Sequence, residues 1–145
     1  MYYDKIDYDV IKLSWDILSS HISLPYIIHI VGTNGKGSTG RFLASILTQL
    51  NQKVLHYSSP HLLTFNERIW IDGDNTSDEI LNSTHEKLQD ILPNTLLEIL
   101  TYFEYTTLLA LFLSDRKDYL VLEAGLGGEF DATNVVKNDL TIVTT

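Results

Sequence analysis

Residues 27–39 read Ile-Ile-His-Ile-Val-Gly-Thr-Asn-Gly-Lys-Gly-Ser-Thr, and this stretch decides the fold. The first five residues are apolar apart from His29, which predicts a short buried strand. A glycine-rich turn follows, then a lysine and two hydroxyl residues that open a segment with helical periodicity. The pattern therefore predicts a strand that turns tightly into a helix.

A turn of this kind suits polyphosphate binding. Glycines let backbone N–H groups approach an anion, the helix N-terminus adds partial positive charge, and a lysine neutralises phosphate oxygens. The order G-x-x-G-K-G-S-T departs from the usual phosphate-binding pattern G-x-x-x-x-G-K-[ST], because Lys36 precedes the last glycine. A chance glycine turn is the alternative, but a lysine between two glycines at a helix start favours phosphate. We predict ATP binding by Gly32, Thr33, Asn34, Gly35, Lys36, Gly37, Ser38 and Thr39, with Lys36 also catalytic.

The rest of the chain alternates apolar runs with helical patterns. Short, non-alternating runs predict buried parallel strands over residues 26–31, 53–57, 119–123 and 140–144. Amphipathic or apolar segments predict helices over residues 8–20, 38–51, 77–92 and 101–114. This alternation predicts an α/β fold with a doubly wound, mainly parallel sheet, whose ligands lie beyond the carboxyl ends of the strands.

Composition limits the possible partners. The chain has 145 residues, the size of one domain, and a net charge of −9, which argues against a nucleic-acid surface. It has no cysteine, which excludes disulfides and agrees with a cytoplasmic location. No apolar run is long enough to span a membrane, so we expect no membrane association. The last predicted strand ends where its functional loop should begin, so we interpret residues 1–145 as a partial domain.

Three further segments lie where strands or helices should meet the ligand edge. They are Tyr-Ser-Ser-Pro-His-Leu-Leu-Thr-Phe-Asn-Glu-Arg-Ile (57–69), Thr-Tyr-Phe-Glu-Tyr-Thr (101–106) and Glu-Ala-Gly-Leu-Gly-Gly-Glu-Phe-Asp-Ala-Thr-Asn (123–134). Together with the glycine-lysine turn, they resemble the N-terminal ATP-binding domain of folylpolyglutamate synthase/dihydrofolate synthase. That family belongs to the Mur-ligase-like, ATP-dependent amide-forming ligases. The resemblance extends from Tyr26 to the end of the chain.

The resemblance implies the fold of the Mur ligase central domain and an ATP-dependent acid–amino-acid ligase. Such an enzyme would phosphorylate the carboxylate of dihydropteroate or folate and join L-glutamate to it through an acyl phosphate. By the same resemblance, the C-terminal glutamate-binding domain, a second metal-binding histidine and a carbamylated lysine would lie beyond Thr145. We expect the parent to be a monomer. Because these parts are missing, we expect this chain to be inactive alone and able to self-associate through exposed apolar surface.

Site residues follow from the resemblance in two groups. Ser59 and Glu123 would bind Mg²⁺, whereas the alternatives are an ordinary turn residue for Ser59 and a turn-capping carboxylate for Glu123. The pterin substrate would contact Thr101, Tyr102, Phe103, Glu104, Phe130, Asp131 and Ala132. For Phe103, plain core packing is an equally good interpretation. One departure is that Glu129 and Phe130 replace the family's usual Arg-Leu pair.

Two other functions remain open at this point. Another Mur-type amino-acid ligase would share the glycine-lysine turn, although the motifs at 101–104 and 131–134 argue against it. A non-catalytic nucleotide- or pterin-binding module would fit a chain that lacks half of the ligase machinery. The histidines of the chain carry no assigned chemistry, and we expect them to be core or surface residues.

Overall fold

The computed structural model describes residues 8–126, 129 and 131–145. Its strands form one sheet in the order β4-β3-β2-β5-β1-β6, within this part of the chain. Strands β2, β5, β1 and β6 run parallel, whereas β3 and β4 continue the sheet in antiparallel pairs. The strands are β1 (Tyr26–Gly32), β2 (Val54–Tyr57), β3 (Ile69–Ile71), β4 (Asp74–Asn75), β5 (Tyr119–Glu123) and β6 (Leu140–Thr144).

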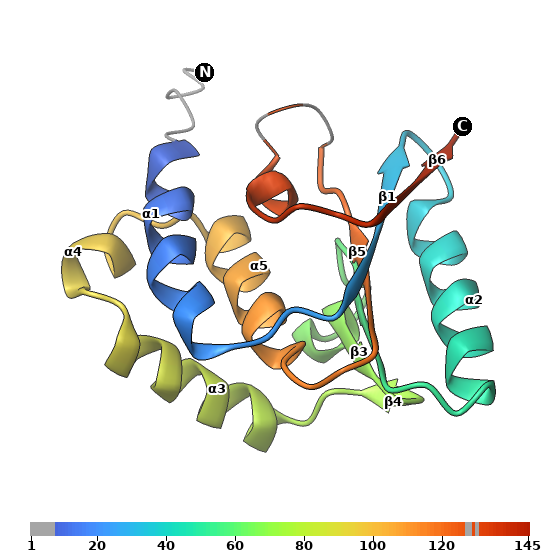
Figure 1. The fold of residues 1–145 in the computed structure, drawn as a ribbon, viewed down its shortest axis with the longest axis horizontal. Coiled ribbons are helices and arrows are strands. Elements are labelled where there is room, and N and C mark those ends of the chain that lie inside the picture. Colours follow the sequence, from blue (N-terminus) through green and yellow to red (C-terminus); the bar gives the residue numbers. More distant parts are fainter. Residues whose placement is uncertain (1–7, 127–128, 130) are drawn as a thin grey trace.

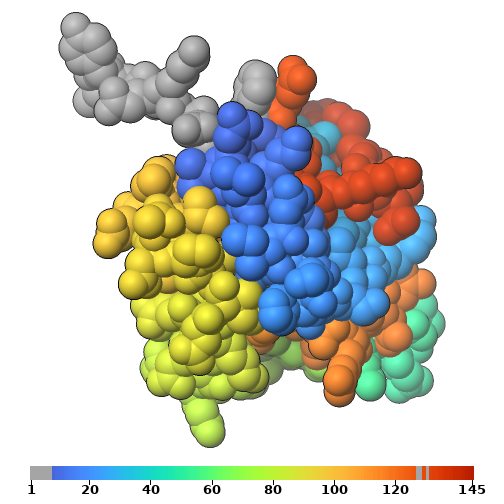
Figure 2. Space-filling model, turned by 60° about the vertical axis from the view of Figure 1, so that its left-hand side comes forward, coloured from blue at the N-terminus to red at the C-terminus, as the bar shows by residue number. Residues whose placement is uncertain are grey.

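Helices cover the two faces of the sheet unequally (Figure 1). On one face lie α1 (Tyr8–Leu18), α3 (Asp78–Ile91), α4 (Asn94–Leu97) and α5 (Tyr102–Leu113), and on the other lies α2 (Lys36–Gln49). Figure 2 views the many-helix face, where α1 lies between the α3–α4 segment and the chain around residues 132–145. Short 3₁₀ turns η1 (Ser19–His21), η2 (Phe65–Arg68) and η3 (Ala132–Val135) complete the described structure.

Side chains of the central strands alternate between two apolar clusters. Leu120 and Leu122 of β5 join the larger cluster beneath α1, α3 and α5, whereas Val121 between them joins the smaller cluster beneath α2. This alternation follows from the two-residue period of a strand, and it explains why the predicted runs were apolar at successive positions. The sheet is thus buried on both faces at its centre.

The four parallel strands and four long helices agree with the sequence predictions to within a few residues. The sheet is mainly parallel, as predicted, but the β3–β4 hairpin, which adds antiparallel pairs at one edge, was missed. Its signal was the Asp72-Gly73 pair between two extended segments, where both residues have positive φ, 50° and 121°. The strands on either side are so short that their periodicity carried little information.

No helix among the described residues is long and apolar enough to cross a bilayer. The outer face of α2 exposes Phe42 and Ile46, and Leu50, the residue directly after the helix, continues this stripe at the same spacing of four. Self-association through such surface stays a prediction.

Candidate nucleotide and substrate site

The glycine turn (residues 32–38) leads from β1 into α2 at the carboxyl end of the sheet. Gly32 has φ 133°, and a Cβ there would overlap the carbonyl of Thr144 on the neighbouring strand, so only glycine fits. Gly35, at φ 78°, takes the left-handed conformation directly before the helix. The helix begins at Lys36, two residues earlier than predicted. The first N–H groups of a helix have no partner within the helix. In α2 these are the N–H groups of residues 36–38, which are part of the glycine turn.

Two polar groups of the glycine turn are bonded within the chain. The Lys36 ammonium donates to the Gly32 carbonyl at 3.0 Å, which holds the cation over the turn. The Asn34 backbone N–H donates to the Thr145 carbonyl at 2.8 Å. Asn34 was predicted to be a phosphate-binding residue, but its N–H is bonded here to Thr145, the residue after β6. An anion at this turn would have to be held mainly by residues 35–38.

Glu123 is the last residue of β5, Ser59 follows the neighbouring parallel strand β2 by two residues, and the two meet at the same edge of the sheet. The Ser59 backbone N–H donates to Glu123 Oε2 at 3.2 Å, and Glu123 is only 5% exposed. Burial raises the pKa of the Glu123 carboxyl, while the Ser59 N–H and the Lys36 charge oppose that rise. A Cβ on Gly37 would lie 3.4 Å from Glu123 Oε2, so the first turn of α2 passes directly beside this carboxylate.

These groups surround one cavity of about 570 Å³. Its lining comprises the glycine turn, part of the loop after β2, and single residues of neighbouring elements: Thr33, Asn34, Gly35, Lys36, Gly37, Ser38, Arg41, His56, Ser58, Ser59, Pro60, Leu62, Glu67, Asn75 and Glu123. On one side of the cavity, the Lys36 ammonium and the N-terminus of α2 can hold a phosphate. On the other side, Glu123 and Ser59 can hold a metal ion bound to that phosphate.

The donor set at this cavity fits magnesium better than a metal that requires a protein cage. No three His, Asp or Glu side chains gather as a metal-binding group within the described ranges. Mg²⁺ commonly takes one or two protein oxygens and completes its shell with water and phosphate. The Glu123 carboxylate and the Ser59 hydroxyl supply oxygens of this kind.

The Ser59 loop (residues 58–68) is organised by one carboxylate. Glu67 accepts backbone hydrogen bonds from Leu62, Leu63 and Thr64 at 2.8, 3.0 and 2.9 Å. These N–H groups, that of Leu62 foremost, lower the pKa of Glu67, so it stays ionised. Thr64 and Glu67 form a capping box that starts η2.

His56 and Arg41 form a contact that the sequence analysis missed. Arg41 Nε donates to His56 Nδ1 at 3.2 Å, and the ring is 1% exposed. Its Nε2 faces Gly40 of α2, where a Cβ would overlap the ring, and has no hydrogen-bond partner. Burial and the Arg41 charge lower the pKa of His56 to about 3, so the imidazole is neutral.

The predicted pterin residues divide into groups with different surroundings. Thr101 and Glu104 form the capping box of α5: Glu104 Oε2 accepts from the Thr101 N–H and hydroxyl, each at 2.8 Å. Phe103 lies against Gly125, so closely that a Cβ there would overlap its ring, and the same Cβ would lie 3.2 Å from Asp131 Oδ2. Phe103 and Asp131 are therefore neighbours, with buried Ala132 directly after Asp131.

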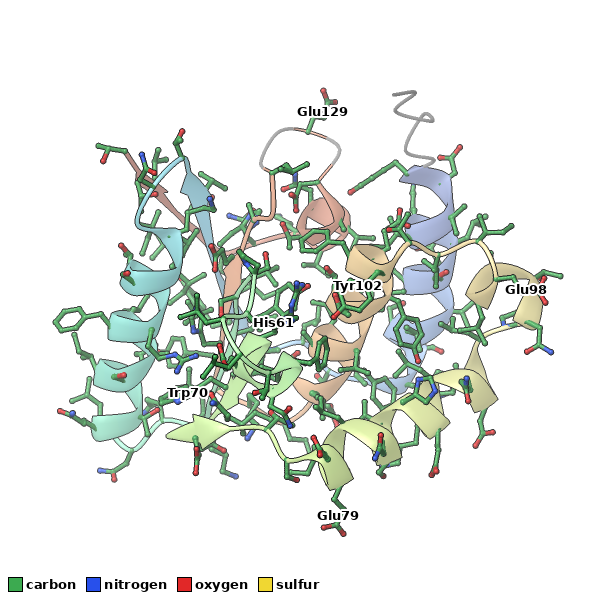
Figure 3. The ribbon with its side chains drawn as sticks, turned by 180° about the vertical axis from the view of Figure 1, so that it is seen from behind. His61, Trp70, Glu79, Glu98, Tyr102 and Glu129 are labelled. Atoms are coloured by element: carbon green, nitrogen blue, oxygen red, sulfur yellow. The ribbon has the colours of Figure 1, made fainter. Side chains whose placement is uncertain are left out.

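Tyr102 faces a different direction. Its ring lies 6.2 Å from the Phe65 ring, and the Arg68 guanidinium lies 5.3 Å above it. Figure 3 shows Tyr102 of α5 and His61 of the Ser59 loop on adjoining parts of the structure, and Arg68 Nε donates to His61 Nδ1 at 2.9 Å. Phe130 lies outside the described residues. The structure thus brings together Phe103 and Asp131, but not Tyr102 with them.

Asp131 is held by a network that also contains His29. The Asp131 carboxylate accepts hydrogen bonds from Leu126 N–H and from the N–H and hydroxyl of Thr133. The Thr133 hydroxyl is 2.8 Å from His29 Nε2, and burial lowers the pKa of this histidine. His29 was expected to be an ordinary strand residue, whereas through Thr133 it supports the loop that carries Asp131, a predicted substrate-binding residue.

Comparison with known proteins identifies the family. No protein-family model matches the chain. The dihydrofolate synthase/folylpolyglutamate synthase of Haemophilus influenzae is 44% identical over 123 residues, which are 83% of this chain and 27% of that protein. The chain therefore spans about a quarter of the length of the curated relatives that it matches first.

Solved structures agree. The crystal structure of Helicobacter pylori folylpolyglutamate synthetase matches with a TM-score of 0.87 and 43% identity, over 96% of this chain and 36% of that chain. Escherichia coli FolC in complex with DHPP and ADP matches with a TM-score of 0.85 and 37% identity, over 99% and 35%. A bifunctional folylpolyglutamate synthase/dihydrofolate synthase with Mn, AMPPNP and L-glutamate bound gives 0.82 and 35%, over 97% and 34%. This chain belongs to the folylpolyglutamate synthase/dihydrofolate synthase family.

Proposed function

We propose that this chain forms the MgATP-binding part of a ligase that joins L-glutamate to the carboxylate of dihydropteroate or folate. The observation that carries the proposal is the meeting of Lys36, the first turn of α2, Ser59 and Glu123 around one cavity. Relatives with the same fold bind ADP, or AMPPNP with Mn, as well as DHPP and L-glutamate.

In this proposal the glycine turn holds the nucleotide phosphates. The Lys36 ammonium, now on the Gly32 carbonyl, would exchange that partner for a phosphate oxygen. The N–H groups of residues 35–38 and the partial positive charge of the α2 N-terminus would hold the remaining oxygens. These groups neutralise charge and fix the γ-phosphate in place, which is the main contribution of protein groups to phosphoryl transfer.

Ser59 and Glu123 would hold the magnesium ion. When bound, the ion would neutralise phosphate charge and orient the γ-phosphate toward the attacking carboxylate. The Ser59 N–H already fixes one oxygen of Glu123, so the carboxylate is oriented in advance. Its burial raises the pKa, and a nearby cation favours the ionised form, so metal binding and ionisation of Glu123 reinforce each other.

For the pterin, Phe103, Asp131 and Ala132 form the better-supported group. The Phe103 ring can stack on a flat heterocycle, and the Asp131 carboxylate can accept hydrogen bonds from its amino-pyrimidinone edge. Tyr102 faces the Ser59 loop instead, so its contact with substrate would be made from a different side.

The proposed reaction has two steps. A substrate carboxylate oxygen attacks the γ-phosphorus, the bond to ADP breaks, and an acyl phosphate forms. The amino nitrogen of glutamate then attacks the acyl carbon, phosphate leaves, and the nitrogen loses a proton. Since the chain spans about a quarter of its curated relatives, we expect it to bind nucleotide but not to complete this reaction alone.

Titration calorimetry with MgATP on the wild type, Lys36→Ala and Lys53→Ala tests the nucleotide site. Lys53 is exposed and its side chain lies outside the cavity lining, so it controls for the loss of one positive charge. We expect Lys36→Ala to weaken binding by roughly tenfold or more, as for a lost charge-assisted hydrogen bond, and Lys53→Ala to have little effect. Equal affinities in all three proteins would exclude the phosphate role of Lys36.

The ligase activity needs a separate measurement. ADP release is followed with dihydropteroate, L-glutamate and MgATP, on this chain and on a full-length relative. We expect turnover by the relative and none by this chain alone. Comparable turnover by both would show that the active site is complete within these 145 residues.

A further inference from the structure

Arg41 of α2 contacts three other elements of the structure. Its Nε donates to His56 Nδ1 on β2 at 3.2 Å, and its Nη2 donates to the Glu67 carbonyl in η2 at 3.4 Å. Its guanidinium also lies 5.0 Å from the centre of the Trp70 ring on β3. The side chain lines the cavity that contains Lys36, Ser59 and Glu123. Arg41 was not predicted to be a site residue, and the proposed function gives it no role.

The element that Arg41 contacts through Glu67 is the Ser59 loop. That loop is tied together internally by the three N–H groups on the Glu67 carboxylate and by the Ser58 N–H, which donates to the Arg68 carbonyl at 2.9 Å. The Ser58–Arg68 bond joins the neighbour of Ser59 to the neighbour of Glu67, so we expect a displacement of Glu67 to be passed on to Ser59. Arg41 connects this loop to α2, the helix that begins with Lys36.

We propose that Arg41 is a positioning residue for the metal–nucleotide site, which holds the Ser59 loop at a fixed distance from Glu123 and the first turn of α2. The inference rests on the proposed function, because it assumes that Ser59 and Glu123 receive the metal of MgATP. In this proposal Arg41 acts through its hydrogen bond to the Glu67 backbone carbonyl.

The geometry around His56 explains why the guanidinium stays in place. Nδ1 accepts the Arg41 hydrogen bond, so the ring proton of the neutral imidazole is on Nε2. The ring is confined because Nε2 packs directly against Gly40 of the same helix. The planar guanidinium can thus donate to the His56 ring and the Glu67 carbonyl at once while it stacks on Trp70, an arrangement that a lysine ammonium cannot reproduce.

Binding with and without metal tests the inference. Dissociation constants are measured by calorimetry for MgATP, and for ATP with excess EDTA, on the wild type, Arg41→Ala, Arg41→Lys and Lys87→Ala. Lys87 lies exposed on α3 and serves as the control for removing a cation from a helix. The thermal midpoint of each protein is recorded in parallel. Arg41→Lys keeps the charge, so it still carries the test where Arg41→Ala fails to fold.

We expect both Arg41 variants to weaken MgATP binding by about tenfold and to raise the half-saturating Mg²⁺ concentration, with metal-free ATP binding changed by less than roughly twofold. Two variants of His56 test the same contact. His56→Leu removes the acceptor of the Arg41 hydrogen bond and should weaken MgATP binding as Arg41→Ala does. His56→Asn keeps an acceptor and should retain most of the affinity. A purely structural role would lower the thermal midpoint and affect both nucleotide forms equally.

The possible failures are distinguishable. If the wild type binds MgATP and the Arg41 variants change both nucleotide forms in the same proportion, or neither, the positioning role is wrong and the proposed function stands. If the wild type binds no MgATP, the proposed function is overturned and this inference with it.

Discussion

The two faces of the sheet are built from the same strands but differ in the side chains that they pack against the helices. On the face beneath α1, α3 and α5, side chains such as Leu108 and Leu120 form a large apolar cluster. On the face beneath α2 the cluster is smaller, and charged and ring side chains lie between helix and sheet. Successive residues divide between these roles: Tyr57 joins the large cluster, while its neighbour His56 meets Arg41.

The difference lies in how closely a helix backbone can approach the sheet. On the α2 face, Gly37 and Gly40 have no side chain, so the helix backbone lies close to the sheet. The backbone at Gly37 lies beside Glu123, and the backbone at Gly40 lies beside the His56 ring. On the opposite face, leucine side chains of α5 lie between its backbone and the sheet, so the helix backbone cannot approach as closely. We therefore expect substitutions in the apolar core beneath α5, away from Phe103, to change stability without changing MgATP affinity, and those on the α2 face to change both.

The largest expected effect is on the α5 face. Leu108 is fully buried, and Leu108→Ala should lower the free energy of unfolding by about 2–5 kcal/mol, because the cavity that it leaves cannot fully collapse. Urea unfolding measures this change, with exposed Leu50→Ala as the control. MgATP affinity of the folded variant should match the wild type. A variant that loses affinity in proportion to stability would show that the two faces are not independent.

A smaller loss is expected from one added methyl group on the α2 face. In Gly40→Ala the Cβ would overlap His56 Nε2 and lie 3.2 Å from Ile30 Cδ1, so helix and sheet must separate. We expect a loss of about 1–3 kcal/mol in unfolding free energy, typical of overpacking, and weaker MgATP binding. Denaturant unfolding and calorimetry test the two parts. Unchanged affinity despite the stability loss would mean that the α2 position does not control the site.

The buried histidine predicts a pH dependence for the α2 face. The pKa of His56 is about 3 in the folded protein and 6.5 when unperturbed, so between these values the unfolded chain binds more protons. Stability should therefore fall as the pH is lowered from 6.5, by up to about 1.4 kcal/mol per pH unit from this group. Urea unfolding at pH 7.5 and 5.0 should show a smaller loss for His56→Asn than for the wild type. Identical losses would remove His56 as the cause.

The smallest effects come from two helix caps in the two regions. The Ser77 hydroxyl caps α3 by accepting from the Ile80 N–H, and Thr64 caps η2 in the Ser59 loop. Each alanine variant should cost about 1 kcal/mol of stability, the usual value for a lost cap. Thermal unfolding measures that loss in both. Only Thr64→Ala should also weaken MgATP binding, and an equal effect of Ser77→Ala would contradict the proposed division.

The sequence predicted features that depend on local pattern or on the geometry of parallel strands. The apolar runs located the central strands, and the glycine turn located the join between β1 and α2. The family resemblance implied that Ser59 and Glu123 lie together, and the Ser59 N–H does bond the Glu123 carboxylate, while the metal-binding role of the pair stays a prediction. The structure adds the direction of each side chain at that edge.

Other features depend on packing that no local pattern contains. Arg41 and His56 meet only because the rotation of α2 against β2 brings two residues 15 positions apart into contact. Tyr102 and Phe103 are adjacent in one motif, yet neighbouring residues of a helix point about 100° apart, so they could not both face one ligand edge. A motif at a helix start therefore identifies a region, and the helix geometry decides which of its members converge.

The Asn34–Thr145 hydrogen bond makes one amide a measure of motion. The Asn34 N–H is bonded to Thr145, the residue after β6, so we expect its exchange rate with solvent to report how often this hydrogen bond opens. The chain end after β6 and the glycine turn are thus linked at a single backbone position, where their opening can be followed.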